Sequence, residues 1–253
     1  MEIAIADLSP WLLVIAPVVI VAAYVVFGLS GFGSTVVAVP ILAHFLPVSF
    51  LVPLMVLLDM ACAALIGSAG REQVSKPELK RLIPFMLVGF VVGVAVLVGA
   101  PDRYLRSALG VFALAVGIHG ILNPTLERTI SPLWSIPAGI AGGAIATIFG
   151  AGGPIYATYL SGRLRDKAEL RSTISTLISI SAFSRAIVYA VGGLLLHKAI
   201  FIGMAVLAPF VWIGLRIGRR IHVGLSQVQM RRAIGAVLVG TGVSLLLRVF
   251  FSP

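Results

Sequence analysis

The chain has little charge and a single cysteine, and each shortage excludes whole classes of protein. Only 11% of its 253 residues are charged, whereas a soluble domain carries about 25% charged residues. A surface so poor in charge excludes a soluble enzyme or a nucleic-acid-binding domain, although the formal net charge is +10. The lone Cys62 excludes an intramolecular disulfide and any metal or iron–sulfur site built from several cysteines.

Apolar sequence is abundant instead. Hydrophobic residues make up 59% of the chain and the mean hydropathy is +1.10. Runs of roughly 20 apolar residues are long enough to cross a bilayer, so the sequence predicts an all-α polytopic membrane protein in contact with lipid. The runs cover Leu8–Phe27, Val48–Ala69, Leu82–Ala100, Tyr104–Leu122, Ile136–Phe149, Ser172–Val191, Ala199–Leu215 and Ala233–Phe250, with a shorter run at Thr35–Leu46.

Most basic residues gather in three stretches between these runs, at residues 71–81, 163–171 and 216–232. Loops rich in lysine and arginine remain on the cytoplasmic side of a membrane, so we expect all three stretches there. Anionic lipid headgroups attract such loops. Basic loops that face the membrane surface therefore explain the high net charge, and we expect no nucleic acid as a partner.

The two halves of the chain share a pattern of residues at fixed distances. The turn at Gly31–Ser34 recurs 119 residues later at Gly150–Gly153. Pro84, Gly89, Gly93, Arg106, Gly110 and Gly117 recur 125 residues later as Pro209, Gly214, Gly218, Arg231, Gly235 and Gly242. We interpret this register as a duplication, with one membrane repeat over residues 1–122 and a second over residues 123–253.

The basic stretches indicate how the two repeats are oriented. One stretch follows the Val48–Ala69 run, whereas the next precedes the equivalent Ser172–Val191 run, so we expect inverted repeats. Inversion requires an odd number of crossings in each repeat. That number is reached if each repeat is a re-entrant helical hairpin plus three transmembrane helices, with Pro132–Leu160 as the second hairpin. The alternative is eight full spans in a parallel repeat.

Two glycine-rich turns interrupt the apolar helices and predict a substrate site. At each turn a half-helix begins, and its free N–H groups and dipole attract an anion. Glycines spaced four residues apart, at 89 and 93, 139 and 143, and 214 and 218, are interpreted as helix-packing positions instead. The candidate substrate-binding residues are Gly31, Phe32, Gly33, Ser34, Thr35, Gly150, Ala151, Gly152, Gly153, Tyr156 and Arg185.

Away from the ends of the runs, the apolar segments contain two charged residues, Asp59 and Arg185. A charge at the centre of a membrane helix costs about 2.5–3.5 kcal/mol, so both side chains should face the protein interior. Arg185 lies near the hydroxyls of Ser181 and Ser184 and could bind an oxyanion through paired hydrogen bonds. Asp59 is the candidate proton-coupling group. The alternative is that Asp59 and Arg185 simply pair with each other.

Signs of an enzyme are weak. Gly28–Gly31 has the G-x-S-G form of an intramembrane serine hydrolase, but such a serine needs a histidine within hydrogen-bond reach. The four histidines lie at the ends of runs or in loops. We therefore expect no catalytic residue, no cofactor and no metal site, and we expect that the protein is not an enzyme.

These motifs, taken together, resemble the sulfite exporter TauE/SafE family. The resemblance covers nearly the whole chain. It departs at Ser34, where a further glycine would be typical. The motifs are Gly31-Phe32-Gly33 leading to Val39-Pro40-Ile41-Leu42, the mirrored Gly150-Ala151-Gly152-Gly153-Pro154, and P-x4-G-x3-G at Pro84–Gly93 and Pro209–Gly218.

The resemblance implies a multi-pass permease of the bacterial inner membrane. Its substrates would be small sulfur-containing anions such as sulfite, sulfoacetate or other organosulfonates. The sequence therefore favours a secondary transporter, with coupling to protons and assembly as a homodimer as further hypotheses. A passive anion channel and an intramembrane serine hydrolase are the alternative functions.

Overall fold

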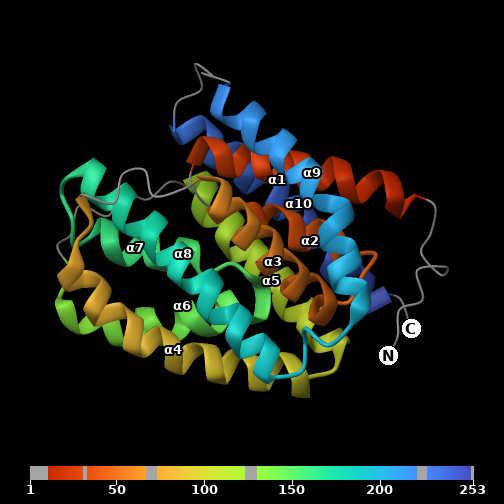
Figure 1. Cartoon of the computed structure of the whole chain (residues 1–253), viewed down its shortest axis with the longest axis horizontal. Helices are drawn as coiled ribbons and strands as arrows, with labels where there is room; N and C mark the ends of the chain where they lie inside the picture. The colour runs from red at the N-terminus through yellow and green to blue at the C-terminus, as the bar shows by residue number, and fades with distance from the viewer. Residues whose placement is uncertain (1–10, 31–32, 67–72, 123–129, 221–226, 252–253) are drawn as a thin grey trace.

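The protein is all-helical throughout the residues that its computed structural model describes, which are 11–30, 33–66, 73–122, 130–220 and 227–251. No strand occurs in these ranges (Figure 1). The expected all-α fold is confirmed. The helices are α1 (Leu12–Ser30), α2 (Ser34–Leu42), α3 (Val48–Ile66), α4 (Lys76–Gly99), α5 (Asp102–Leu122), η3 (Pro132–Trp134), α6 (Ser135–Phe149), α7 (Gly153–Ser161), α8 (Lys167–Val191), α9 (Lys198–Arg220) and α10 (Gln227–Phe251).

Seven segments of the described chain are long and apolar enough to cross a membrane. They are α1, α4, α5, η3 with α6, α8, α9 and α10, while α3 contributes a shorter apolar stretch at Val48–Cys62. The outward faces carry large apolar side chains such as Val91, Ile187 and Phe201, each more than half exposed. Such faces are suited to lipid rather than water. The chain is a multi-pass membrane protein, as its composition predicted.

The helix ends depart from the sequence prediction where basic residues stand. The run expected to end at Leu215 continues as helix α9 to Arg220, and helix α4 begins at Lys76 rather than near Leu82. Arginine and lysine have long apolar stems that extend along a helix end while the charge reaches water. Arg216 illustrates this, because its guanidinium lies 4.0 Å from the ring centre of Trp212.

Helices α6 and α7 form a hairpin whose tip is the glycine-rich turn at residues 150–152. Gly150 ends α6 in the left-handed conformation, with φ of 72°. Gly152 contacts Ala146 of α6, and at the open end the N–H of Ile130 donates to the carbonyl of Gly162 over 2.9 Å. The chain therefore enters and leaves this hairpin at neighbouring points.

A buried carboxylate anchors the open end of the hairpin to helix α4. Glu78 is 3% exposed, and its Oε2 accepts a hydrogen bond of 2.7 Å from Tyr159. Its Oε1 accepts from Arg163 at 2.9 Å and from Arg81 at 2.7 Å. The hydrogen bonds to Glu78 raise the pKa of the Arg163 guanidinium, so the arginine keeps its charge at neutral pH.

Close helix packing pairs each hairpin with a helix of the other half. Helix α4 packs along α6, and α9 packs along α1, at opposite edges of the molecule in Figure 1. A Cβ added to Gly89 would overlap the carbonyl oxygen of Ile140, and one added to Gly214 would lie 2.6 Å from that of Val21. Ile140 and Val21 are 119 residues apart, the same distance that separates the two glycine turns.

Helices α5 and α10 pack against each other in the same manner. A Cβ on Gly117 would lie 2.7 Å from the carbonyl oxygen of Gly235, and one on Gly235 would lie 2.6 Å from that of Gly117. The interpretation of the spaced glycines as packing positions is thus confirmed. The division into two repeats and the inverted orientation of those repeats stay predictions.

Candidate functional site

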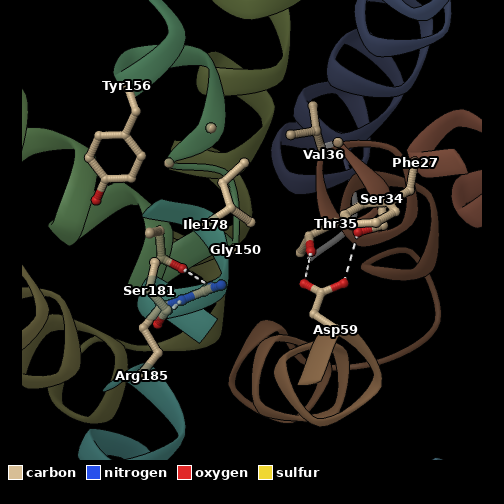
Figure 2. A pocket seen from close by; sticks show the side chains of 14 residues that line it. Phe27, Ser34, Thr35, Val36, Asp59, Gly150, Tyr156, Ile178, Ser181 and Arg185 are labelled. Atoms are coloured by element: carbon tan, nitrogen blue, oxygen red, sulfur yellow. Dashed lines mark hydrogen bonds between the residues drawn. The ribbon is translucent and has the colours of Figure 1, made fainter. Parts of the chain in front are cut away.

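A pocket lies between the two helix breaks, where α2 and α3 of the first half face α7 and α8 of the second (Figure 2). Its empty volume is about 400 Å³, part of which is open to solvent. The lining residues are Phe27, Gly33, Ser34, Thr35, Val36, Asp59, Ala146, Gly150, Gly152, Gly153, Tyr156, Ile178, Ser181 and Arg185.

The first wall of the pocket is a carboxylate surrounded by hydroxyls. Asp59 Oδ1 accepts hydrogen bonds from Tyr24 at 2.7 Å and from Ser34 at 2.9 Å. Its Oδ2 accepts from Thr35 at 3.0 Å. Three hydroxyl groups from α1 and α2 thus converge on a side chain of α3 that is only 9% exposed.

Gly33 makes this arrangement possible. It precedes α2 with φ of 98°, a left-handed conformation that side chains other than glycine rarely adopt. The turn places Ser34 and Thr35 at the first positions of α2, where their hydroxyls reach Asp59. The conformational freedom of one glycine therefore brings the hydroxyls of Ser34 and Thr35 to the carboxylate of Asp59.

The second wall is a buried arginine. Arg185 of α8 is 3% exposed, and its Nη1 donates to the carbonyl of Ala146 over 2.7 Å. Its Nε donates over 3.3 Å to the carbonyl of Ser181. Tyr189, one turn further along α8, donates to the carbonyl of Thr147 over 2.6 Å. Both side chains therefore hold the end of α6 through backbone oxygens rather than through acids.

Arg185 and Asp59 do not pair directly. In the described part of the chain, ion pairs join Glu78 to Arg81 and Arg163, and Asp102 to Arg106. None joins Asp59 to Arg185, and Figure 2 shows the two side chains on opposite sides of the pocket. The alternative interpretation, in which these residues form a direct ion pair with each other, is therefore wrong, and their opposite charges face each other across the pocket.

Tyr156 adds an unpartnered donor to the second wall. It is 1% exposed, and its hydroxyl has no hydrogen-bond partner within the part of the chain that the structure describes. A buried hydroxyl without a partner costs free energy, so its presence at a pocket indicates a ligand that supplies the missing acceptor. In Figure 2 the ring lies on the Arg185 side of the pocket.

The two breaks touch each other. A Cβ added to Gly150 would overlap Cγ2 of Thr35, so the tip of the second hairpin lies directly against the start of α2. Gly150 is therefore required for two reasons, its left-handed backbone and the absence of a side chain. This contact closes the pocket between the breaks.

Most of the residues predicted for the site line this one pocket. The structure brings together nine of the twelve, counting Asp59: Gly33, Ser34, Thr35, Asp59, Gly150, Gly152, Gly153, Tyr156 and Arg185. Ala151 is buried but is not among the lining residues. Gly31 and Phe32 lie outside the described residues.

The sequence prediction omitted five lining residues: Phe27, Val36, Ala146, Ile178 and Ser181. Three of these could have been predicted from helical spacing, because they lie on the same helix face as a predicted site residue. Ser181 and Ile178 precede Arg185 by one and two turns on α8, and Ala146 precedes Gly150 by one turn on α6. A signal for Phe27 and Val36 is absent, because apolar residues beside a break look like any other part of the core.

Among the described residues that line the pocket there is no histidine. His44 instead contacts the carbonyl oxygens of Pro40 and Ile41, each at 3.1 Å, and the hydroxyl of Ser244 at 3.0 Å.

Comparison with known proteins gives one family and two relatives. The family model described as "Sulfite exporter TauE/SafE" matches residues 15–245. The "Probable inner membrane transporter protein TsaS" of Comamonas testosteroni is 26% identical over 193 residues, which are 76% of this chain and 81% of the relative. The "Probable sulfite/organosulfonate exporter TauE" of Cupriavidus necator is 26% identical over 167 residues, 66% of this chain and 64% of the relative. No solved structure matches.

Proposed function

Because the chain belongs to the sulfite exporter TauE/SafE family, we propose that this membrane transporter is a secondary transporter of small sulfur-containing anions. Sulfite, sulfoacetate and other organosulfonates are the substrates in this proposal, and the bacterial inner membrane is its location. The printed names of the two relatives, an inner membrane transporter and a sulfite or organosulfonate exporter, support both parts. Transport rather than catalysis is supported by the same names and by the family.

The observation that carries the proposal is a buried guanidinium that lines the pocket and has no acidic partner. A guanidinium has five N–H donors, and Arg185 is observed to donate to two backbone carbonyls. The remaining donors fit the oxygens of a sulfonate or sulfite, which arginine binds as a planar fork. The unpartnered hydroxyl of Tyr156 supplies a further donor to the same anion.

The break at Gly150–Gly152 supports the same assignment. Helix α7 begins at Gly153, and the first N–H groups of a helix lack partners within it. Gly152 and Gly153 both line the pocket, so an anion can approach the backbone there without a side chain in the way. Pro154 follows at a position where its missing N–H has no cost. The anion in our proposal contacts Arg185, Tyr156 and this helix start.

The proposal also includes how transport is driven. Asp59 is the coupling group, and a proton is the ion that the sequence predicts for it. Residues 1–122 and 123–253 form the two inverted units, and each contributes one break to the pocket. Each hairpin re-enters the membrane on the side from which it came, so that the pocket lies near the midplane, where transporters bind their substrates.

Anion binding to the purified protein tests the proposal. Calorimetry with sulfite, sulfoacetate, taurine, sulfate, acetate and chloride should give binding of sulfite or a sulfonate and none of acetate. Arg185→Gln should abolish that binding, whereas Arg171→Gln, at an exposed position of the same helix, should leave it unchanged. Equal binding by both variants, or a preference for carboxylates, would contradict the site or the substrate class.

Uptake into proteoliposomes distinguishes a transporter from a passive channel. A transporter accumulates the anion against its gradient when an ion gradient is imposed across the bilayer, whereas a channel only equilibrates it. Accumulation that disappears in Asp59→Asn, with anion binding retained, is the expected result.

A further inference from the structure

The two walls of the pocket carry opposite charge. Their charged side chains determine the sign of each wall. Asp59 makes the wall of the first half negative, and Arg185 makes the wall of the second half positive.

An anion alone would leave this pocket with an unbalanced charge. Without a ligand, the single negative charge of Asp59 offsets the single positive charge of Arg185. A bound anion takes over Arg185, and the carboxylate then lies in an apolar span with no cation beside it. Such a charge is expensive inside a membrane protein. A cation that enters with the anion restores neutrality.

The oxygen atoms around Asp59 suit a metal cation better than a proton. Its carboxylate already accepts three hydrogen bonds from hydroxyls, two on Oδ1 and one on Oδ2. These donors leave one of about four lone-pair sites on the carboxylate, and that site is on Oδ2. A proton would use that site alone, whereas a hard metal cation binds several oxygens at once. Each hydroxyl keeps two lone pairs while it donates.

The end of helix α1 supplies further oxygens at the same place. Phe27, in the last turn of α1, lines the pocket, and the last carbonyls of a helix lack partners within it. Carbonyls at the end of a broken helix are the groups that hold sodium in many secondary transporters. Ser34 and Thr35 add two adjacent hydroxyls from the start of α2.

We infer that Asp59, Ser34 and Thr35, with the carboxyl end of α1, form a sodium site that fills together with the anion site at Arg185. This inference rests on the proposed anion transport and replaces the proton of that proposal by a sodium ion. Because both ligands occupy one pocket, each should strengthen the binding of the other by the same factor, about fivefold or more.

The test measures binding of sulfoacetate, supplied as its choline salt, to the full-length protein in detergent. The dissociation constant should be at least about fivefold lower in sodium chloride than in choline chloride of equal ionic strength. Thr35→Val should abolish this difference, since it removes the hydroxyl and keeps the shape. Thr241→Val is the matched control, because Thr241 bonds to a carbonyl of its own helix α10, away from the pocket, and it should keep the full effect.

Thermal unfolding gives a second reading that does not need the anion. The probe is the buried thiol of Cys62, which reacts with a fluorescent maleimide only when the protein unfolds. Sodium alone should raise the temperature midpoint of unfolding of the wild type but not that of Asp59→Asn. If sulfoacetate binds equally well in sodium and choline, or if its affinity follows pH and not sodium, the sodium site is refuted while the anion site stands. If no sulfur anion binds, the proposed function fails, and the midpoint alone then decides whether sodium binds at Asp59.

Discussion

The contact between the two breaks makes Gly150→Ala a sharp test of how the pocket is closed. Alanine in the left-handed conformation costs about 1–2 kcal/mol, and Gly150 has φ of 72°. The added Cβ also overlaps Cγ2 of Thr35, and overpacking of this kind costs about 1–3 kcal/mol. We expect the variant to lose about 2–5 kcal/mol of unfolding free energy in total.

Gly33→Ala separates the two contributions. Gly33 has φ of 98°, and a Cβ there would meet only Val26, at 4.0 Å. This variant should therefore show the backbone strain alone, about 1–2 kcal/mol. Thr35→Ser removes the overlapping methyl group and keeps the hydroxyl that bonds to Asp59. Combined with Gly150→Ala, it should recover part of the overpacking cost of about 1–3 kcal/mol, because the Cβ of residue 35 still lies 2.9 Å from the added Cβ. It should recover none of the strain.

The assay is unfolding in mixed micelles, with labelling of Cys62 as the probe. A double-mutant cycle of Gly150→Ala and Thr35→Ser gives the interaction energy directly. The reasoning would be refuted if Gly150→Ala cost no more than Gly33→Ala, or if the cycle gave an interaction energy near zero. Either result would mean that the two breaks do not touch in the folded protein.

Three further substitutions test other parts of the structure. Tyr156→Phe should leave the melting midpoint unchanged, because the tyrosine hydroxyl has no partner among the described residues, yet it should weaken sulfite binding about fivefold or more. Tyr189→Phe is the control in the same two assays. It loses a hydrogen bond to a carbonyl, so it should lower the melting midpoint and leave sulfite binding unchanged. Gly89→Ala should prevent folding or sharply lower the melting midpoint, whereas Gly99→Ala, with open space around it, should not; equal midpoints would contradict the packing. Glu78→Gln should lower the free energy of unfolding in mixed micelles by about 1.5–3 kcal/mol. An unchanged free energy would show that the contacts of Glu78 with the hairpin do not stabilise the fold.

The sequence predicted the backbone of the site better than its contacts. Glycines clustered inside apolar runs mark helix breaks, and both breaks lie at the pocket. Asp59 and Arg185 were identifiable because charge is costly in a membrane helix. The sequence pointed to an ion pair between them as one alternative, since opposite charges are the obvious partners.

The structure shows partners that leave no trace in a sequence. Arg185 donates to backbone carbonyls, which every residue carries, so no side chain marks the acceptor. Tyr24 reaches Asp59 from another helix, 35 residues away in the chain, and the hydroxyl of a tyrosine in an apolar run indicates no particular partner. The ends of α4 and α9 differ from prediction for a related reason, because basic residues at a helix end can remain helical.

The exchange of packing partners between the halves has a consequence for biogenesis. Helix α1 packs on α9, yet the ribosome reaches residue 198 only after residue 30 has long been made. At about 5–20 residues per second, that interval is roughly 10–30 s. During this time α1, which bears the Tyr24 hydroxyl that bonds to Asp59, remains without the helix that packs along it. The first half of the chain therefore completes its packing only when translation is nearly finished.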